Sequence, residues 1–174
     1  MWLSSGASRP YNSFGNGAAM RVSAAGFLAE SLEEARALAR SSAGVTHNHP
    51  EGIKGAVATA EGIFLARGGA SLAEIRSALS AYYDLDFTLD AIRPDYDFDV
   101  TCQGTVPQAV VAFLESEGFE DAKNIPHSRP CRRARKLSLQ VKNLKRAKSI
   151  LSESALTARL RAKRFWGYGR NQKN

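Results

Sequence analysis

One stretch of the sequence reads Ser13-Phe14-Gly15-Asn16-Gly17-Ala18-Ala19-Met20-Arg21-Val22, in which a small-residue turn leads into good helix formers. Glycine tolerates backbone conformations that other residues avoid, and asparagine tolerates the left-handed region better than most residues do. A turn of this kind can direct several free N–H groups at one point, and such a point attracts phosphate. Most Gly-x-Gly turns are simple turns, so this stretch alone leaves both interpretations open.

A second stretch of similar design reads Thr46-His47-Asn48-His49-Pro50-Glu51-Gly52-Ile53-Lys54-Gly55-Ala56. Pro50 suits the first position of a helix, because its missing N–H would have no partner there. Asn48 or His49 can cap that helix. His47 is then expected beside a helix N-terminus, where the helix dipole favours anions.

Together the two stretches are specific enough to indicate a family. They resemble the ADP-ribosylglycohydrolase family, the relatives of the hydrolase that removes ADP-ribose from dinitrogenase reductase. A third stretch agrees, and it reads Asp99-Val100-Thr101-Cys102-Gln103-Gly104-Thr105-Val106-Pro107-Gln108-Ala109. The resemblance runs from about Trp2 to about Ala122, so the chain resembles the central fragment of a family member.

Capping signals divide this region into short helices. Ser31 with Glu34, and Ser71 with Glu74, form capping boxes. With their caps, the predicted helices cover residues 18–28, 31–41, 50–67, 71–83, 86–92 and 105–117. Residues 95–101 alternate apolar and acidic side chains as a strand would, but no partner strand is visible and we prefer an extended loop. The pattern predicts an all-α fold, and the resemblance implies an orthogonal helical bundle that is incomplete at both ends.

The resemblance implies an ADP-ribose-binding site on the first two stretches. In the family, ADP-ribose is held by a Ser-aromatic-Gly-Asn-Gly loop and by a histidine on a second loop. The matching residues are Ser13, Phe14, Gly15, Asn16, Gly17 and His47. We expect the backbone N–H groups of residues 15–17 to hold the pyrophosphate, and His47 to bond phosphate or ribose. Arg21 fits a structural ion pair at least as well as a ligand contact.

The resemblance also implies hydrolysis of an N- or O-glycosidic bond to ADP-ribose, with two divalent cations, usually Mg²⁺, that polarise the substrate and activate water. In the family these ions are held by a Thr-Asp-Asp-Thr string and a Gly-Gly-Asp-Ser-Asp-Thr string, and neither string occurs here. We therefore expect no catalytic residue and no metal ligand in this chain. It would be inactive in this form, with weak ADP-ribose binding retained.

Other interpretations of the reactive side chains are less favourable. His47 and His49 supply fewer ligands than a zinc site needs. Cys102 has no candidate base nearby in the sequence, which favours a buried small residue over a nucleophile. The acidic run at 95, 97 and 99 lacks the central glycine and terminal glutamate of a calcium loop, so we expect a solvated loop face.

The net charge of +7 conceals two different parts. Residues 1–122 hold 8 Lys/Arg and 16 Asp/Glu, and we expect them to form a partial glycohydrolase-like domain. Residues 123–174 hold 16 Lys/Arg and a single acid, Glu153. We interpret this basic tail as disordered and derived from a frameshift near codon 122. The alternatives are an authentic divergent tail, or an amphipathic helix with apolar residues at steps of three and four.

The composition of the tail also suggests an alternative function for the protein. Phe165, Trp166 and Tyr168 lie among basic residues, so a non-catalytic nucleotide- or nucleic-acid-binding protein could contact phosphate and stack on bases. No apolar run of about 18 residues and no signal peptide is present, so we expect no membrane partner. Cys102 and Cys131 do not make a disulfide scaffold, and a cytoplasmic protein is the default.

Overall fold

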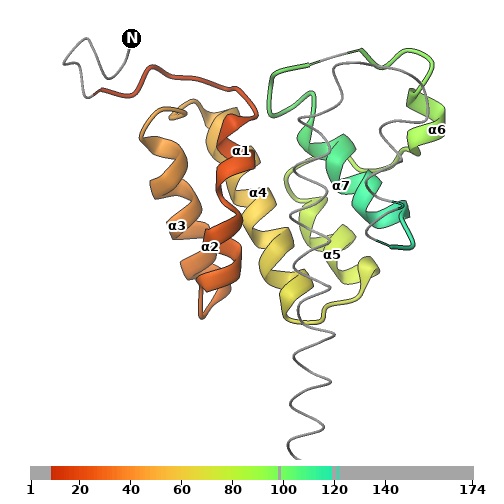
Figure 1. The fold of residues 1–174 in the computed structure, drawn as a ribbon, viewed down its shortest axis with the longest axis horizontal. Helices are drawn as coiled ribbons and strands as arrows, with labels where there is room; N and C mark the ends of the chain where they lie inside the picture. Colours follow the sequence, from red (N-terminus) through yellow and green to blue (C-terminus); the bar gives the residue numbers. More distant parts are fainter. Residues whose placement is uncertain (1–8, 98, 119–120, 122–174) are drawn as a thin grey trace, which may run out of the picture.

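The computed structural model describes residues 9–97, 99–118 and 121, and within them the chain is all-α, which confirms the predicted fold class (Figure 1). The helices in this part are α1 (Gly17–Arg21), α2 (Ser23–Leu28), α3 (Leu32–Gly44), α4 (Pro50–Arg67), α5 (Leu72–Leu79), α6 (Leu89–Ile92) and α7 (Val106–Glu115). One isolated antiparallel bridge joins Gly15 to Thr101. The described residues of 95–101 form no strand, so the extended loop was the better interpretation.

The longest helix, α4, forms the centre of the fold. It begins at Pro50 after the His49 cap, whose Nδ1 accepts a hydrogen bond of 3.1 Å from the Glu51 N–H. In Figure 1, α2 and α3 lie on one side of α4 and α5 lies on the other. Every residue from Gly55 to Ile63 is buried, because neighbours cover α4 on most of its circumference. Bounds and cap agree with the sequence prediction for this helix.

Other helix ends differ from the prediction. The first predicted helix is divided into α1 and α2 at Val22, whose φ of −89° and ψ of 11° are not helical. Helix α5 ends at Leu79 rather than near Tyr83, and in its last turn Ser80 Oγ donates to the Arg76 carbonyl at 2.8 Å. Such a side-chain bond competes with the continuation of the helix.

The predicted N-cap residues are right at α3, α5 and α7 and wrong at α6, although the side chain at α7 makes no cap bond. Ser71 and Glu74 form the complete capping box. At α6 the cap is Thr88, which accepts from the Ala91 N–H at 3.3 Å, and not Asp86. Thr105 precedes α7 but donates its hydroxyl to the Thr101 carbonyl instead of accepting from the helix.

Most of the buried apolar side chains form one cluster, to which α1 to α7 all contribute. None of the described helices combines the length and the apolar character that a membrane crossing requires. The basic tail of residues 123–174, with its predicted amphipathic helix or disorder, lies outside the described residues.

Candidate functional site

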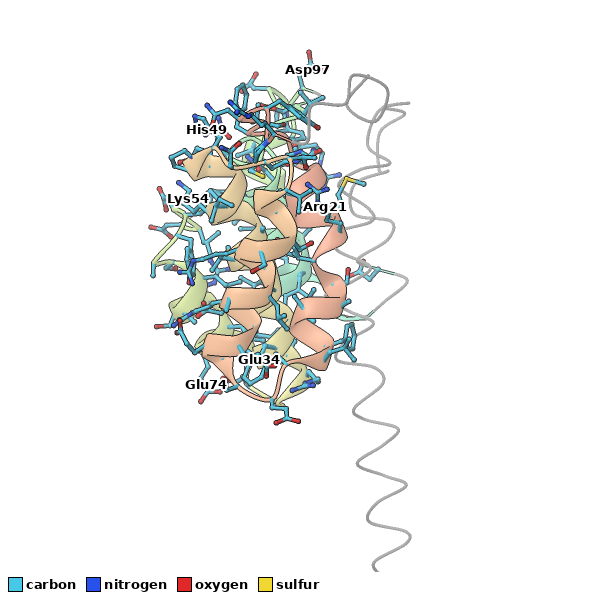
Figure 2. The ribbon with its side chains drawn as sticks, turned by 90° about the vertical axis from the view of Figure 1, so that its left-hand side faces the viewer. Arg21, Glu34, His49, Lys54, Glu74 and Asp97 are labelled. Carbon is cyan, nitrogen blue, oxygen red and sulfur yellow. The ribbon has the colours of Figure 1, made fainter. Side chains whose placement is uncertain are left out.

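Three segments far apart in the sequence meet at one end of the bundle: residues 12–17, 46–49 and 99–102. Figure 2 shows the labelled His49 and Asp97 at this end, with Glu34 and Glu74 at the opposite end. Hydrogen bonds join the segments: Asn12 N–H to Asn48 Oδ1 (2.8 Å), Ser13 N–H to the Thr46 carbonyl (3.4 Å), Asn16 N–H to the Val100 carbonyl (2.7 Å) and Cys102 N–H to the Phe14 carbonyl (2.9 Å). The third segment, known from the sequence only as a family string, thus supports the first loop.

The two glycines of the first loop lie against the His47 imidazole. A Cβ on Gly15 would stand 3.5 Å from His47 Nε2 and 3.2 Å from Ser13 Oγ, and a Cβ on Gly17 would stand 3.3 Å from Nε2. The structure therefore brings the predicted loop and the predicted histidine together.

Asn16 does not adopt the left-handed conformation that asparagine tolerates. Asn16 has a right-handed φ of −66°, and the positive φ of this region belongs to Asn12, at 56°. The glycines are needed for the space that they leave to the imidazole, because a side chain there would crowd it.

The backbone N–H groups are less available than the sequence suggests. The Gly15 N–H donates to Ser13 Oγ at 3.2 Å, and the Asn16 N–H donates to Val100 at 2.7 Å. In this structure the Asn16 N–H, which the sequence interpretation assigned to a pyrophosphate, is thus used within the protein. Of the three N–H groups of residues 15–17, that of Gly17 has no hydrogen-bond partner among the described residues. Helix α1 has five residues, so its terminus adds little dipole.

The side chains of the loop differ in exposure. Asn16 is 2% exposed, and its Nδ2 lacks a hydrogen-bond partner in the described part of the chain. A buried donor without a partner is costly, which makes it a candidate for binding water or ligand. Phe14 is 44% exposed, and its ring centroid lies 5.4 Å from that of His49 in an edge arrangement. Ser13 is partly buried.

His47 is held by two side chains that the sequence interpretation did not connect with it. Arg21 Nη2 lies 2.7 Å from His47 Nδ1 and 2.5 Å from Thr46 Oγ1, and Thr46 Oγ1 lies 2.7 Å from Nδ1. Burial, and to a lesser degree the Arg21 charge, lower the pKa of His47 below its ordinary value. The imidazole is therefore neutral at pH 7. Arg21 meets a histidine and a threonine, so among the described residues it does not form the ion pair that the sequence suggested.

The described residues do not fit a metal ion. They contain no group of three or more His, Cys, Asp or Glu side chains that could hold one. Cys102 is fully buried, and its thiol donates to the Gly15 carbonyl at 3.3 Å. Burial is the main cause that raises the pKa of this thiol to about 11, which agrees with a packing role rather than a nucleophile. Asp99 Oδ1 accepts from the Thr101 N–H at 2.6 Å and so stiffens the third segment.

Comparison with known proteins identifies the family. No curated protein matches the chain. A family model described as ADP-ribosylglycohydrolase matches residues 1–141, which is most of the chain and continues past Ala122, where the resemblance seen in the sequence ends. The chain belongs to the ADP-ribosylglycohydrolase family.

Proposed function

We propose that this chain binds ADP-ribose, free or attached to a protein, through residues 13–17 and His47. Membership of a glycohydrolase family supports a function of this kind, because such enzymes act on ADP-ribosylated substrates and depend in general on metal ions. The proposal concerns the binding step, and no part of it uses a metal ion. The described residues supply no site for one.

The observation that carries the proposal is the position of His47 Nε2. It lies 3.3–3.5 Å from the points where side chains on Gly17 and Gly15 would begin. Among the described residues it has no hydrogen-bond partner, while Nδ1 has two. Because Nε2 lies close to two glycine backbones, a ligand oxygen bonded to this ring atom would also lie near the backbone of the first loop.

The neighbouring side chains suit the remaining chemistry of ADP-ribose. Ser13 supplies a hydroxyl beside the Gly15 backbone. Phe14 offers a partly exposed aromatic ring next to His49, and aromatic faces accept bases. The Asn16 amide, buried without a partner for Nδ2, provides a further donor. Together these groups can bind the pyrophosphate of ADP-ribose without a cationic side chain in direct contact with it.

The first test is calorimetric titration of the full chain with ADP-ribose, AMP and ribose 5-phosphate. We expect ADP-ribose to bind most tightly, because AMP and ribose 5-phosphate each lack part of the pyrophosphate-linked molecule. His47→Ala and Asn16→Ala each remove one donor, and we expect each to weaken ADP-ribose binding by about tenfold or more. His47→Gln, which keeps a side-chain N–H, should lose less.

Leu28→Gln serves as the matched control, because Leu28 is 75% exposed and lies at the end of α2 rather than in the three segments. It should leave the affinity unchanged. Equal affinities for AMP and ADP-ribose would indicate a general nucleotide site and contradict the proposal. Affinities that do not respond to substitutions at residues 16 and 47 would contradict it as well.

We further propose that this chain releases no ADP-ribose by itself. The carboxylate strings that hold metal ions in the family are absent from the sequence. Incubation with an ADP-ribosylated protein, with and without added Mg²⁺, should leave the modification in place. Release that depends on Mg²⁺ and is lost in a binding-deficient variant would overturn this part of the proposal.

A further inference from the structure

Arg21 joins the first loop to the second at the site, although it lies on α1 and has an exposed side chain. Its Nη2 lies 2.5 Å from Thr46 Oγ1 and 2.7 Å from His47 Nδ1, across more than 20 residues of sequence. Figure 2 shows Arg21 in the half of the bundle that also carries His49. The contact is therefore a tertiary one between two loops that meet at the candidate site.

The donor chemistry of arginine decides which nitrogen of His47 carries the proton. A guanidinium has N–H donors and no acceptor, so the nitrogen that faces Arg21 must be the acceptor. In a neutral imidazole one nitrogen accepts and the other donates. Thr46 fits the same scheme, since its oxygen can accept from Arg21 while its hydrogen points to Nδ1. Nδ1 is thus the unprotonated nitrogen, and the proton is on Nε2.

The protonated nitrogen, Nε2, lies beside the first loop. Nε2 is the His47 atom closest to the Cβ positions of both Gly15 and Gly17. Within the described part of the chain it meets no acceptor. A ligand oxygen next to Nε2 would accept this hydrogen bond, whereas a ligand N–H group would be repelled.

We propose that Arg21 is a positioning residue of the site and holds His47 as the Nε2–H tautomer. His47 then presents a hydrogen-bond donor to an acceptor oxygen of the bound ligand. This proposal rests on the proposed ADP-ribose function. Arg21 does not need to touch the ligand. Its positive charge also opposes protonation of the ring to which it donates, so the donor stays a neutral imidazole.

The charged and titratable groups around the ring agree with this role. Arg21 of α1 is bonded to the ring, and the Tyr11 ring centroid lies 6.1 Å from that of His47. The titratable groups that follow His47 in the chain have other partners: His49 accepts from the Glu51 N–H, and Glu51 pairs with Lys54 at 2.6 Å. Of these, Arg21 is the one hydrogen-bonded to the imidazole. No acid among the described residues is bonded to His47, so nothing there favours its charged form.

The test begins without ligand, on the ¹⁵N-labelled full chain. Long-range ¹H–¹⁵N correlation spectra distinguish a protonated from a bare imidazole nitrogen, and the spectrum of His47→Gln assigns the His47 signals. At pH 7.5 we expect a protonated Nε2 and a bare Nδ1. In Arg21→Met we expect a mixture of tautomers and a higher titration midpoint for His47. A protonated Nδ1 in the parent chain, or an unchanged ring in Arg21→Met, would overturn the proposal.

Two further variants test whether the effect of Arg21 on the His47 tautomer comes from its position, from its charge or from a change in folding. Arg21→Lys keeps a positive donor and should restore most of the Nε2–H tautomer. Arg40→Met on α3 removes a guanidinium whose distance to Glu33 is 4.0 Å, and it should leave the His47 signals unchanged. Arg21 is exposed, so Arg21→Met should keep the far-ultraviolet circular dichroism of the parent.

Titration with ADP-ribose then connects the tautomer to binding. We expect Arg21→Met to bind ADP-ribose about tenfold more weakly than the parent, with Arg21→Lys between the two. An Arg21→Met affinity equal to that of the parent, despite a disturbed tautomer, would overturn the positioning role. A parent chain that shows the Nε2–H tautomer but binds no ADP-ribose would instead contradict the proposed function, so the two failures are distinguishable.

Discussion

At the scale of the residue, Gly17 provides the space that the His47 imidazole occupies. A Cβ there would stand 3.3 Å from Nε2, which is closer than most such contacts, so Gly17→Ala must shift the ring by a few tenths of an ångström. We expect ADP-ribose affinity to fall by about tenfold. Stability should change by less than about 1 kcal/mol, because alanine suits the first turn of a helix.

Gly44→Ala is the matched control for this substitution. Gly44 lies at the end of α3, and a Cβ on it would meet nothing within 4 Å. Titration calorimetry and urea denaturation of both variants check the prediction. An unchanged affinity in Gly17→Ala would show that the His47 ring does not need its present place.

The lowered pKa of His47 gives a second prediction at this scale. The unfolded chain binds a proton at this residue near pH 6.5, its ordinary value, whereas the folded chain binds it only at lower pH. Between these two pH values the unfolded state holds more protons, so the free energy of unfolding falls as the pH falls. Urea midpoints measured from pH 7.5 to pH 5 should decrease, and the decrease should be smaller in His47→Gln. Identical slopes for the two chains would contradict the assignment.

The residue types of the site were predictable from the sequence, but their contacts were not. Ser13, Asn16 and His47 belong to short strings with a recognisable composition. Two contacts depend on how three distant segments meet. One is the bond from Arg21 to His47, and the other is the hydrogen bond from the Asn16 N–H to the Val100 carbonyl. No local signal reports such a meeting, although the place of Arg21 within the first string was a hint.

At the scale of the element, α3 and α4 are joined by an ion pair between the partly exposed Arg36 and the buried Glu61. Glu61 is 2% exposed and accepts two hydrogen bonds from Arg36, of 2.8 and 3.0 Å, and one from the Tyr82 hydroxyl at 2.6 Å. Removal of Arg36 leaves a buried carboxylate with only the tyrosine as partner. We expect Arg36→Met to lower the free energy of unfolding by about 3 kcal/mol.

Arg40→Met is the control on the same helix. Its guanidinium is about half exposed and lies 4.0 Å from Glu33, so its loss should cost less than about 0.5 kcal/mol. Urea unfolding monitored by circular dichroism compares the two variants. Equal losses of stability in Arg36→Met and Arg40→Met would mean that the pair of Arg36 and Glu61 contributes no more than a surface contact.

Helix boundaries were predictable where the sequence carries the stop and start chemistry itself. Pro50 and Gly68 define α4, and the box of Ser71 and Glu74 defines the start of α5. The break at Val22 and the early end of α5 have no such signal. The break at Val22 accompanies the packing of α2 against α4, where Gly26 allows a close approach that a Cβ, at 2.6 Å from the Ala60 carbonyl, would prevent. Tertiary contacts of this kind override local propensity.

At the scale of the whole molecule, the charge is divided unevenly along the sequence. Residues 1–122, which contain the loops of the site, hold 8 Lys/Arg and 16 Asp/Glu, while residues 123–174 hold 16 Lys/Arg and one acid. A polyanion is therefore attracted to the second part of the sequence and repelled by the first. This separation allows the proposed ADP-ribose site and the alternative nucleic-acid function to be tested in one protein.

We expect double-stranded DNA to bind the full chain without displacing ADP-ribose. Contacts between DNA phosphates and basic residues release counterions, so DNA affinity should fall steeply between about 50 and 200 mM salt. ADP-ribose affinity should change little, because the proposed site uses neutral donors. Heparin in place of DNA separates the charge of residues 123–174 from base stacking on Phe165, Trp166 and Tyr168. Competition between DNA and ADP-ribose at constant salt would instead make residues 13–17 and His47 part of a nucleic-acid surface.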